Sequence, residues 1–498
     1  PPPSALRHPM AAAAPEPPPS MAAEPAAMPE AGAEPIDVDV AVVGAGWTGL
    51  ATAAALLAYG VRRFVLLEAG LGVGTFWEGN YDRIRLHTPW HGLPCDGGRA
   101  LYSYPMFKSK RQIMRYLQEY FELHNLQPYA RFGERVTRIA QQRPGSWSVH
   151  TDAEWGPRRY RCRFVAICTS KLRLPHIPVI PGRECFKGRV LHSREYRTGE
   201  AFLGKDVLVV GSGNSAAEIC ADLVERGAGA VTMLVHGPRL FIPLPRLGIG
   251  AWLGRLRGML TEERAYAEWR LRFGSEAYWK LVKAKDAKSA SLAVDMSSYG
   301  IDSPDLGFSE ANIKFGRIGT FDQGAIGMIR SGRVSVRRAR LASFTETEAR
   351  LDDGGALRAD VVVLATGFRP GLEDFLAEPD RFLQRGQEGK GCGTAFLTPV
   401  TDNRGRSSVD SSLFFVGFDQ AVNGGLSMGF WGWSCGFQIA QGLGLVDKDR
   451  QFSLEALPEQ QRDVVRRRLV LGAAALGAVA AGAVTTGIAV WGRRRAKL

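Results

Sequence analysis

Residues 36–68 read IDVDVAVVGAGWTGLATAAALLAYGVRRFVLLE, and the fold class follows from this segment. It predicts a β-branched strand over 36–43, a glycine turn over 44–49, an alanine-rich helix over 50–59 and a second strand over 64–68. A strand, a helix and a strand in this order form a βαβ unit, which belongs to a parallel sheet. Because its turn has the pattern GxGxxG, the unit predicts a dinucleotide-binding site.

The three glycines of this turn have separate physical roles. Gly44 permits the turn, Gly46 lets a pyrophosphate approach the backbone, and Gly49 lets helix and strand pack closely. The N–H groups at the start of the helix favour phosphate. Glu68 ends the next strand, where its carboxylate would accept from ribose hydroxyls and disfavour a 2′-phosphate. The site therefore suits FAD, and its predicted contacts are Gly44, Ala45, Gly46, Trp47, Thr48, Gly49 and Glu68.

A second unit of this kind begins at residues 205–223, which read KDVLVVGSGNSAAEICADL. The strand that follows, 230–235, ends in His236 and carries no carboxylate, so a 2′-phosphate is tolerated there. Arg239 is within reach of such a phosphate, which favours NADPH over NADH; the alternative for Arg239 is an ordinary solvated side chain. The predicted contacts of this second site are Gly211, Gly213, Asn214, Ser215, Ala216 and Arg239.

Two such units predict an α/β fold with two Rossmann-like domains, the NADPH-binding domain being inserted into the FAD-binding domain. Further apolar strands over 164–168 and 361–365 support parallel sheets. The predicted boundaries are 1–35 for a disordered leader rich in Pro, Ala and Glu, 36–185 and 361–446 for the FAD-binding domain, 186–360 for the NADPH-binding domain, 447–468 for a linker and 469–491 for a transmembrane helix.

The last of these segments, Leu469 to Trp491, contains no charged residue and has arginines on both sides. As a helix it would span about 34 Å, enough for a hydrocarbon core of about 30 Å. The alternative is a buried core helix. The prediction is a cytosolic catalytic body anchored in the endoplasmic reticulum or in the outer membrane of another organelle.

Composition restricts the other possibilities. The formal net charge is +13, but part of it lies beside the apolar segment, so the charge does not indicate a nucleic-acid partner. The 7 cysteines are scattered and form no CxxC, which argues against a disulfide framework and against a metal site. No metal and no nucleic acid are therefore predicted.

Between the two glycine turns, residues 186–196 read FKGRVLHSREY. This segment resembles the FxGxxxHxxxY fingerprint of flavin-containing monooxygenases, with Phe186, Gly188, His192 and Tyr196 in register. The resemblance covers roughly residues 36–445 and includes Trp77, the run YDRIRLHTP at 81–89 and ATGFRP at 365–370. The run at 81–89 is most similar to plant YUCCA-type enzymes, which oxidatively decarboxylate indole-3-pyruvate.

The resemblance implies an FAD- and NADPH-dependent monooxygenase. NADPH would reduce FAD, and the reduced flavin would add O₂ to form a C4a-hydroperoxide that oxygenates a small N or S nucleophile or a 2-oxo acid such as indole-3-pyruvate. Such chemistry requires a site from which water is excluded. The predicted catalytic residues are His87 and Thr88, which would lie near the flavin ring, and His192; a packing role beside FAD is the alternative for His87.

Trp77, Thr366, Gly367 and Asn423 complete the predicted cofactor contacts. Asn423 lies in a segment, 413–438, that is rich in glycine and aromatic residues. This segment predicts a strand ending near Gly417, then a loop and a helix against the flavin ring; the alternative is a tightly packed strand and helix of the core.

Two other functions stay open at this stage. One is a flavin-dependent NADPH oxidase or reductase without oxygen insertion, although a disulfide reductase would need a redox cysteine pair. The other is a membrane-tethered nucleotide-binding protein that has lost oxygenation. The glycine turns, Glu68 and His192 argue against such decay, whereas departures from the family's usual residues at His87 and His236 keep it open.

Overall fold

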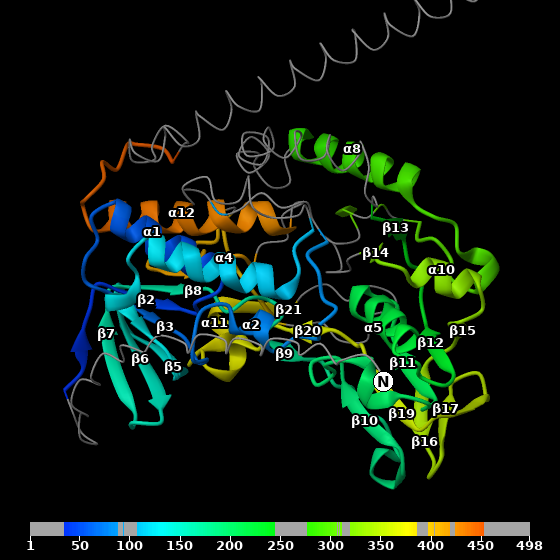
Figure 1. Ribbon diagram of the computed structural model, residues 1–498. Helices are drawn as coiled ribbons and strands as arrows, with labels where there is room; N and C mark the ends of the chain where they lie inside the picture. The colour runs from blue at the N-terminus through cyan, green and yellow to red at the C-terminus, as the bar shows by residue number, and fades with distance from the viewer. Residues whose placement is uncertain are drawn as a thin grey trace, which may run out of the picture.

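The computed structural model describes residues 34–87, 93, 107–244, 276–305, 307, 309–310, 319–385, 397–402, 404–418 and 424–452. These residues form two bodies, each built on a parallel five-stranded sheet, which lie side by side (Figure 1). The predicted leader up to residue 33 and the predicted transmembrane helix 469–491 lie outside the described residues. Within the described part of the chain, no helix combines the length and apolar character needed to cross a bilayer.

The sheet of the first body has the strand order β23-β8-β2-β3-β4. Its three central strands are buried along their whole length, as their unbroken apolar sequences predict. The strands are β2 (Val40–Val43), β3 (Phe64–Leu67), β4 (Ala130–Arg131), β8 (Phe164–Ile167) and β23 (Leu413–Phe415).

Helices cover one face of this sheet and a smaller sheet covers the other (Figure 1). Val40 and Val42 face the helices, whereas Ala41 and Val43 face the smaller sheet, as the alternation of a strand requires. The helices are α1 (Trp47–Ala58), α4 (Lys110–Leu123) and α12 (Gly424–Gly442), and the smaller sheet consists of β1 (Ile36–Asp37), β5 (Glu134–Arg143), β6 (Ser146–Ala153) and β7 (Arg158–Cys162).

The sheet of the second body has the strand order β10-β19-β11-β12-β15, also parallel. Its strands are β10 (Arg189–His192), β11 (Val207–Val210), β12 (Val231–Val235), β15 (Ser335–Arg338) and β19 (Val361–Leu364). Helices α5 (Asn214–Glu225) and α10 (Ala325–Arg330) pack on one face, and the antiparallel strands β16 (Leu341–Phe344), β17 (Glu348–Leu351) and β18 (Ala356–Arg358) pack on the other.

Further elements complete the described structure. The helical ones are α2 (Thr75–Glu78), α8 (Glu276–Leu292), α11 (Pro379–Phe382) and the 3-10 turns Gln127–Tyr129, Arg183–Cys185, Gly199–Phe202, Ser297–Tyr299 and Leu372–Asp374. The strands are β9 (Leu174–Pro175), β13 (Phe241–Pro243), β14 (Thr320–Asp322), β20 (Phe368–Arg369), β21 (Leu383–Arg385) and β22 (Leu397–Pro399).

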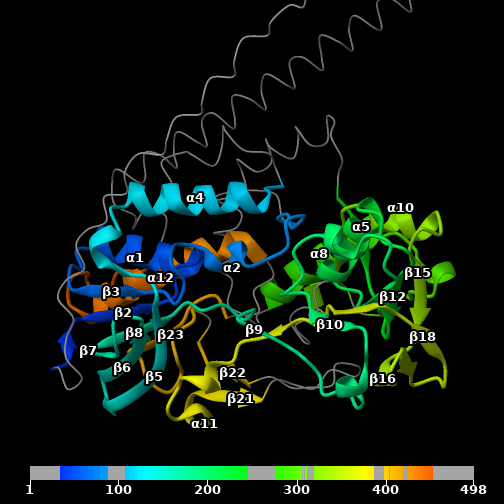
Figure 2. The ribbon, with the colours of Figure 1, turned by 60° about the horizontal axis from the view of Figure 1, so that its bottom comes forward.

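The predicted boundary at residue 361 is wrong, because β19 lies between β10 and β11 in the sheet of the second body. The chain passes between the bodies at β9 and returns at β20, and these two strands pair with each other in antiparallel fashion (Figure 2). The inserted body therefore runs between these two crossing strands rather than over 186–360. A strand of sequence VVVL fits the centre of either parallel sheet, so its sequence alone does not show to which body it belongs.

Helix α12 packs directly against helix α1, and glycines make the close approach possible. A Cβ added at Gly432 would lie 2.6 Å from the Cβ of Ala51, and one added at Gly436 would lie 2.5 Å from the Cβ of Ala55. The strand β23 and helix α12 thus match the strand and helix predicted for 413–438, and Gly432 and Gly436 serve core packing.

A Gly436→Ala variant is expected to lose about 1–3 kcal/mol of unfolding free energy, because its new methyl group overpacks the α1–α12 contact. Chemical denaturation of the purified protein measures this loss. A Gly327→Ala variant on α10 is the control, since a Cβ there meets no atom within 4 Å. Its stability should stay level or rise slightly, and equal stability losses for both variants would contradict the packing argument.

Candidate active site

The first glycine turn joins β2 to α1 with the geometry that the sequence predicts. Gly44 has a φ of +103°, which favours glycine. A Cβ at Gly49 would lie 1.8 Å from the carbonyl oxygen of Gly44, so only glycine lets helix and strand meet here. A Cβ at Gly46 would meet no atom within 4 Å. Gly46 is the N-cap of α1 and no side chain caps the helix, which leaves a space that suits an anion.

Glu68 follows β3 and lies beside this turn. Its Oε2 accepts from the N–H of Ala45 at 2.8 Å, and its Oε1 accepts from the N–H of Gly70 at 2.8 Å and from Thr75 Oγ1 at 2.9 Å. These three donors fix the carboxylate next to the open space at Gly46. The donor set and the open helix start fit a bound FAD, with Glu68 placed for its ribose.

The other predicted contacts of the first site mainly pack. Thr48 is buried, and Trp47 lies with its ring centroid 6.3 Å from that of Tyr116. Trp77, on α2, is half-buried against the helices that cover the first sheet. The contact of these side chains with the cofactor stays a prediction.

The second glycine turn joins β11 to α5 and repeats this geometry. Gly211 has a φ of +131°, and a Cβ there would lie 2.5 Å from the carbonyl oxygen of Ala365. A Cβ at Gly213 would meet nothing within 4 Å. Gly213 is the N-cap of α5, again without a side-chain cap, and half-buried Ser215 follows it in the first turn. Ala216, in place of a third glycine, is fully buried in the helix–sheet contact.

Strand β14 lies against this second turn, which the sequence did not predict. The Phe321 N–H donates to Asn214 Oδ1 at 2.7 Å, and Thr320 Oγ1 donates to the carbonyl oxygen of Ser212 at 2.6 Å. Arg239 reaches the same turn, because its Nε donates to Ser212 Oγ at 3.2 Å. Arg239 therefore lies beside the second turn, and its contact with a 2′-phosphate stays a prediction.

An Arg239→Ala variant is expected to raise the KM for NADPH about tenfold, equivalent to about 1.4 kcal/mol, and to leave the KM for NADH nearly unchanged. Steady-state oxidation of both cofactors measures the difference. Arg350→Ala, on the surface strand β17, is the matched loss of one positive charge and should change neither value. Equal effects on NADPH and NADH would contradict a 2′-phosphate contact.

His192 links β10 to the returning chain. The Arg194 N–H donates to its Nδ1 at 3.1 Å, so its Nε2 carries the proton and donates to the carbonyl oxygen of Gly367 at 3.0 Å. Burial lowers the pKa of His192, which favours this neutral form. Both ring nitrogens are engaged with backbone atoms, so the geometry is that of a structural link, and the catalytic role stays a prediction.

Tyr196, the last residue of the fingerprint, binds the second body. Its hydroxyl donates to Asp222 Oδ2 on α5 at 2.7 Å, and burial together with the Asp222 charge raises the pKa of Tyr196. Thr366 donates to the carbonyl oxygen of His176, and the His176 N–H donates to the carbonyl oxygen of Gly367 at 2.9 Å. Thr366 and Gly367 thus hold the crossing strands together; their cofactor contacts stay predictions.

The segment Tyr81–His87, which we call the strap, leaves the first body and packs on the second. The Tyr81 ring is buried in the core of the second body, 6.4 Å from the ring of Tyr196. Arg83 pairs with Glu225 and donates to the carbonyl oxygen of Gln323 at 2.8 Å. His87, predicted near the flavin ring, contacts Glu218 on α5. Thr88 and Asn423 lie outside the described residues.

Buried cysteines lie under the first site. Burial raises the pKa of the Cys168 thiol to about 12, and the carbonyl oxygen of this residue lies against Gly44. The described cysteines are Cys162, Cys168, Cys185, Cys220 and Cys435, and all of them are free thiols. Burial therefore keeps the Cys168 thiol protonated, which does not favour the accessible thiolate that disulfide exchange requires.

Comparison with known proteins agrees with this geometry. The family described as "Flavin-binding monooxygenase-like" matches residues 100–237. A probable indole-3-pyruvate monooxygenase of Arabidopsis thaliana, YUCCA9, is 32% identical over 69% of this chain and 78% of its own length. The chain belongs to the flavin-binding monooxygenase family. Another family member from A. thaliana, the probable indole-3-pyruvate monooxygenase YUCCA8, is 31% identical over 81% of this chain and 88% of its own length.

Solved structures of the family share the fold. A cyclohexanone monooxygenase bound to ε-caprolactone has a TM-score of 0.61 at 17% identity, covering 82% of this chain and 88% of its own. A flavin-containing monooxygenase from Stenotrophomonas maltophilia has a TM-score of 0.52 at 20% identity, covering 88% of this chain and 99% of its own. The two-body architecture is therefore that of the family.

Proposed function

We propose that this flavin monooxygenase uses NADPH and O₂ to decarboxylate an aromatic 2-oxo acid oxidatively, with indole-3-pyruvate as the first candidate. The observation that carries the proposal is the pair of glycine turns, each open at its second glycine, at the start of a helix in each body. Family membership gives the reaction class. The relatives named as indole-3-pyruvate monooxygenases support the substrate class.

The reaction consumes one 2-oxo acid, one O₂, one NADPH and one proton. One oxygen atom enters the new carboxylate as CO₂ leaves, and the other becomes water with the two electrons of NADPH. Bound FAD supplies the activation of O₂. The first turn with Glu68 would hold FAD, and the second turn with Arg239 would hold NADPH. The polypeptide itself positions the two cofactors and excludes water.

Turnover of the purified protein with NADPH, indole-3-pyruvate and isotopically heavy O₂ tests this function. We expect indole-3-acetate carrying one heavy oxygen atom, with one NADPH consumed per product. NADPH oxidation that yields only hydrogen peroxide, with this acid and also with a thioether and an amine, would favour an oxidase or reductase. Protein that purifies without flavin and oxidises no NADPH would favour a nucleotide-binding protein that has lost oxygenation.

We also propose that Leu469–Trp491 anchors the catalytic body to the cytosolic face of a membrane, the endoplasmic reticulum being the first candidate. The support is the sequence itself, an uncharged apolar segment between arginine clusters. Alkaline extraction of membranes from cells that express the protein tests the anchor. The full chain should stay in the pellet and a chain ending at residue 452 should be released; release of both would contradict the proposal.

A further inference from the structure

Helix α5 carries a buried carboxylate that the proposed function does not use. Glu218 lies in the helix that begins at the second glycine turn, and its side chain is fully buried. Its Oε1 contacts His87 Nε2 and accepts from Gln323 Nε2 at 2.8 Å. Its Oε2 is buried and has no hydrogen-bond partner among the described residues. The Tyr81 hydroxyl, also on the strap, interacts with the same carboxylate, so His87 is one of the few partners that compensate it.

Burial makes the contact between Glu218 and His87 strong. A carboxylate removed from water costs free energy unless donors or positive charge compensate it. If His87 left, Glu218 would keep only the Gln323 amide and the Tyr81 hydroxyl, and a buried carboxylate that loses one of its few donors is destabilised. The contact between His87 and Glu218 therefore holds the C-terminal end of the strap on α5, and its loss would cost free energy.

A second contact between the strap and α5 provides a natural comparison. Arg83 pairs with Glu225, whose side chain is 44% exposed. Water compensates such a pair when it opens, so exposed pairs contribute little. The two acidic residues thus hold the same strap to the same helix but differ in burial.

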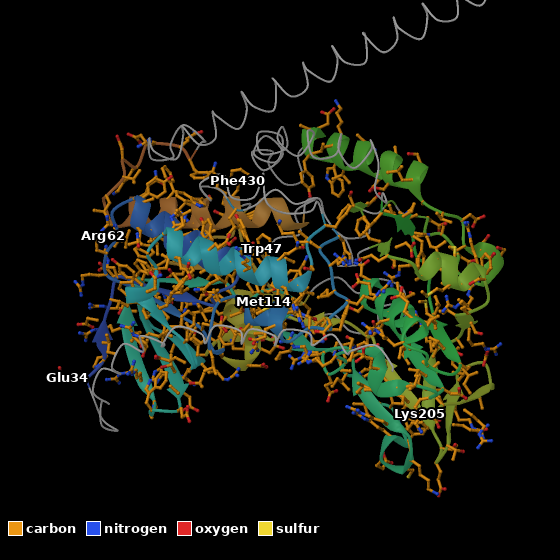
Figure 3. All side chains as sticks on the ribbon, viewed as in Figure 1. Glu34, Trp47, Arg62, Met114, Lys205 and Phe430 are labelled. Atoms are coloured by element: carbon orange, nitrogen blue, oxygen red, sulfur yellow. The ribbon has the colours of Figure 1, made fainter. Side chains whose placement is uncertain are left out.

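The strap also connects the two bodies that carry the predicted cofactor sites. It follows α2 of the first body, and backbone bonds tie it at both ends, from the Asp82 N–H to Arg197 and from the Leu86 N–H to Lys108. Hydride transfer requires a nicotinamide held on α5 to meet a flavin held on α1. Figure 3 shows Trp47, at the start of α1, in the first body and Lys205, which precedes β11, in the second. Misplacement of either cofactor by about 1 Å is enough to lower reaction rates strongly.

We propose that Glu218 is a positioning residue that, by holding His87, fixes the strap against α5 and thereby sets how the two cofactors meet. This role rests on the proposed oxygenation. It acts through His87 and the strap, and it requires neither contact of Glu218 with substrate nor a proton transfer.

Two readouts on the FAD-loaded full chain test this role. In Glu218→Leu, amide hydrogens of the strap peptide 81–87 should exchange about tenfold faster, because the strap opens locally while the rest of the chain keeps its protection. Product formed per NADPH should fall about fivefold or more, with peroxide making up the difference, because the cofactors are less well aligned. The flavin content should stay at the wild-type value.

Three further variants sharpen the test. Glu218→Gln keeps an acceptor oxygen for His87 and Gln323, so its product yield and strap exchange should stay within about twofold of wild type. His87→Ala breaks the same contact from the strap side and leaves α5 intact, so it gives the answer if Glu218→Leu does not fold. Glu225→Gln removes the exposed pair of the same strap and helix, and it should leave both readouts unchanged.

Several results would overturn the proposal. If Glu218→Leu formed as much product per NADPH as the wild type, and its strap amides exchanged at the wild-type rate, the contact with His87 would not hold the strap. A loss of yield with normal strap exchange, or a Glu218→Gln variant as impaired as Glu218→Leu, would assign the effect to the charge of Glu218 and not to positioning. The exchange measurement needs no turnover. A wild-type protein that forms no product would therefore overturn the oxygenase function separately, while exchange still decides whether Glu218 holds the strap.

Discussion

A Gly46→Val variant is expected to fold like the wild type and to purify almost free of FAD. Its backbone is extended at this position, with φ −85° and ψ −164°, which suits any residue. A Cβ there meets no protein atom within 4 Å, so the new side chain fills only the space in front of α1. The affinity for FAD should fall at least about a hundredfold, or about 2.7 kcal/mol, because the pyrophosphate can no longer approach the helix start.

Visible flavin absorbance per mole of protein, with thermal unfolding of the flavin-free form, measures this result. Gly49→Ala is the contrasting variant, since its Cβ would lie 1.8 Å from a backbone oxygen and should damage the fold itself. Gly46→Val should lose flavin but keep its fold, whereas Gly49→Ala should lose flavin and also unfold more easily. If Gly46→Val kept the flavin content of the wild type, the first turn would not be the pyrophosphate site.

The parts of this protein that its sequence predicts are the local ones. The glycine turns, their flanking strands and helices, and the different roles of Gly44, Gly46 and Gly49 all follow from steric rules that act within a few residues. The position of the Glu68 carboxylate was equally predictable from the sequence, because the end of a neighbouring parallel strand must lie beside the turn. Local chemistry and the topology of one βαβ unit were sufficient.

Contacts between distant segments were not predictable in this way. Strand β19 was assigned to the wrong body because an apolar strand carries no mark of its partner. The contact of Phe321 with Asn214 spans 107 positions, and that of His87 with Glu218 spans 131. One signal for Glu218 was available: a carboxylate among the alanines of a helix that must bury one face needs a partner from elsewhere.

The fingerprint at residues 186–196 also separates what the sequence predicts from what only the structure shows. Its four matched residues correctly indicated the family, but the sequence did not say what the side chains do. His192 and Tyr196 hold the crossing chain and helix α5 through hydrogen bonds at 3.0 Å and 2.7 Å. These two residues therefore stabilise the junction between the two bodies, and a catalytic role for His192 stays a prediction.

Gly213→Val is expected to lose NADPH binding and keep FAD, whereas Gly46→Val is expected to lose FAD. Gly213 has an extended backbone, with φ −78° and ψ −177°, and a Cβ there meets no protein atom within 4 Å. The variant should therefore fold and stay yellow, because the first turn is untouched. Its affinity for NADPH should fall at least about a hundredfold, since the valine occupies the approach to the start of α5.

Reduction of the bound flavin under anaerobic conditions measures this loss, first with NADPH and then with dithionite, which needs no nucleotide site. Dithionite should reduce the wild type and Gly213→Val equally, whereas NADPH at concentrations that saturate the wild type should reduce the variant only slowly. Normal reduction by NADPH would mean that the donor binds elsewhere, and the second turn would then be a structural repeat of the first. Loss of flavin from Gly213→Val would contradict the independence of the two sites, because among the residues that the structure describes the backbone contacts of Gly44 and Ala45 come from the first body.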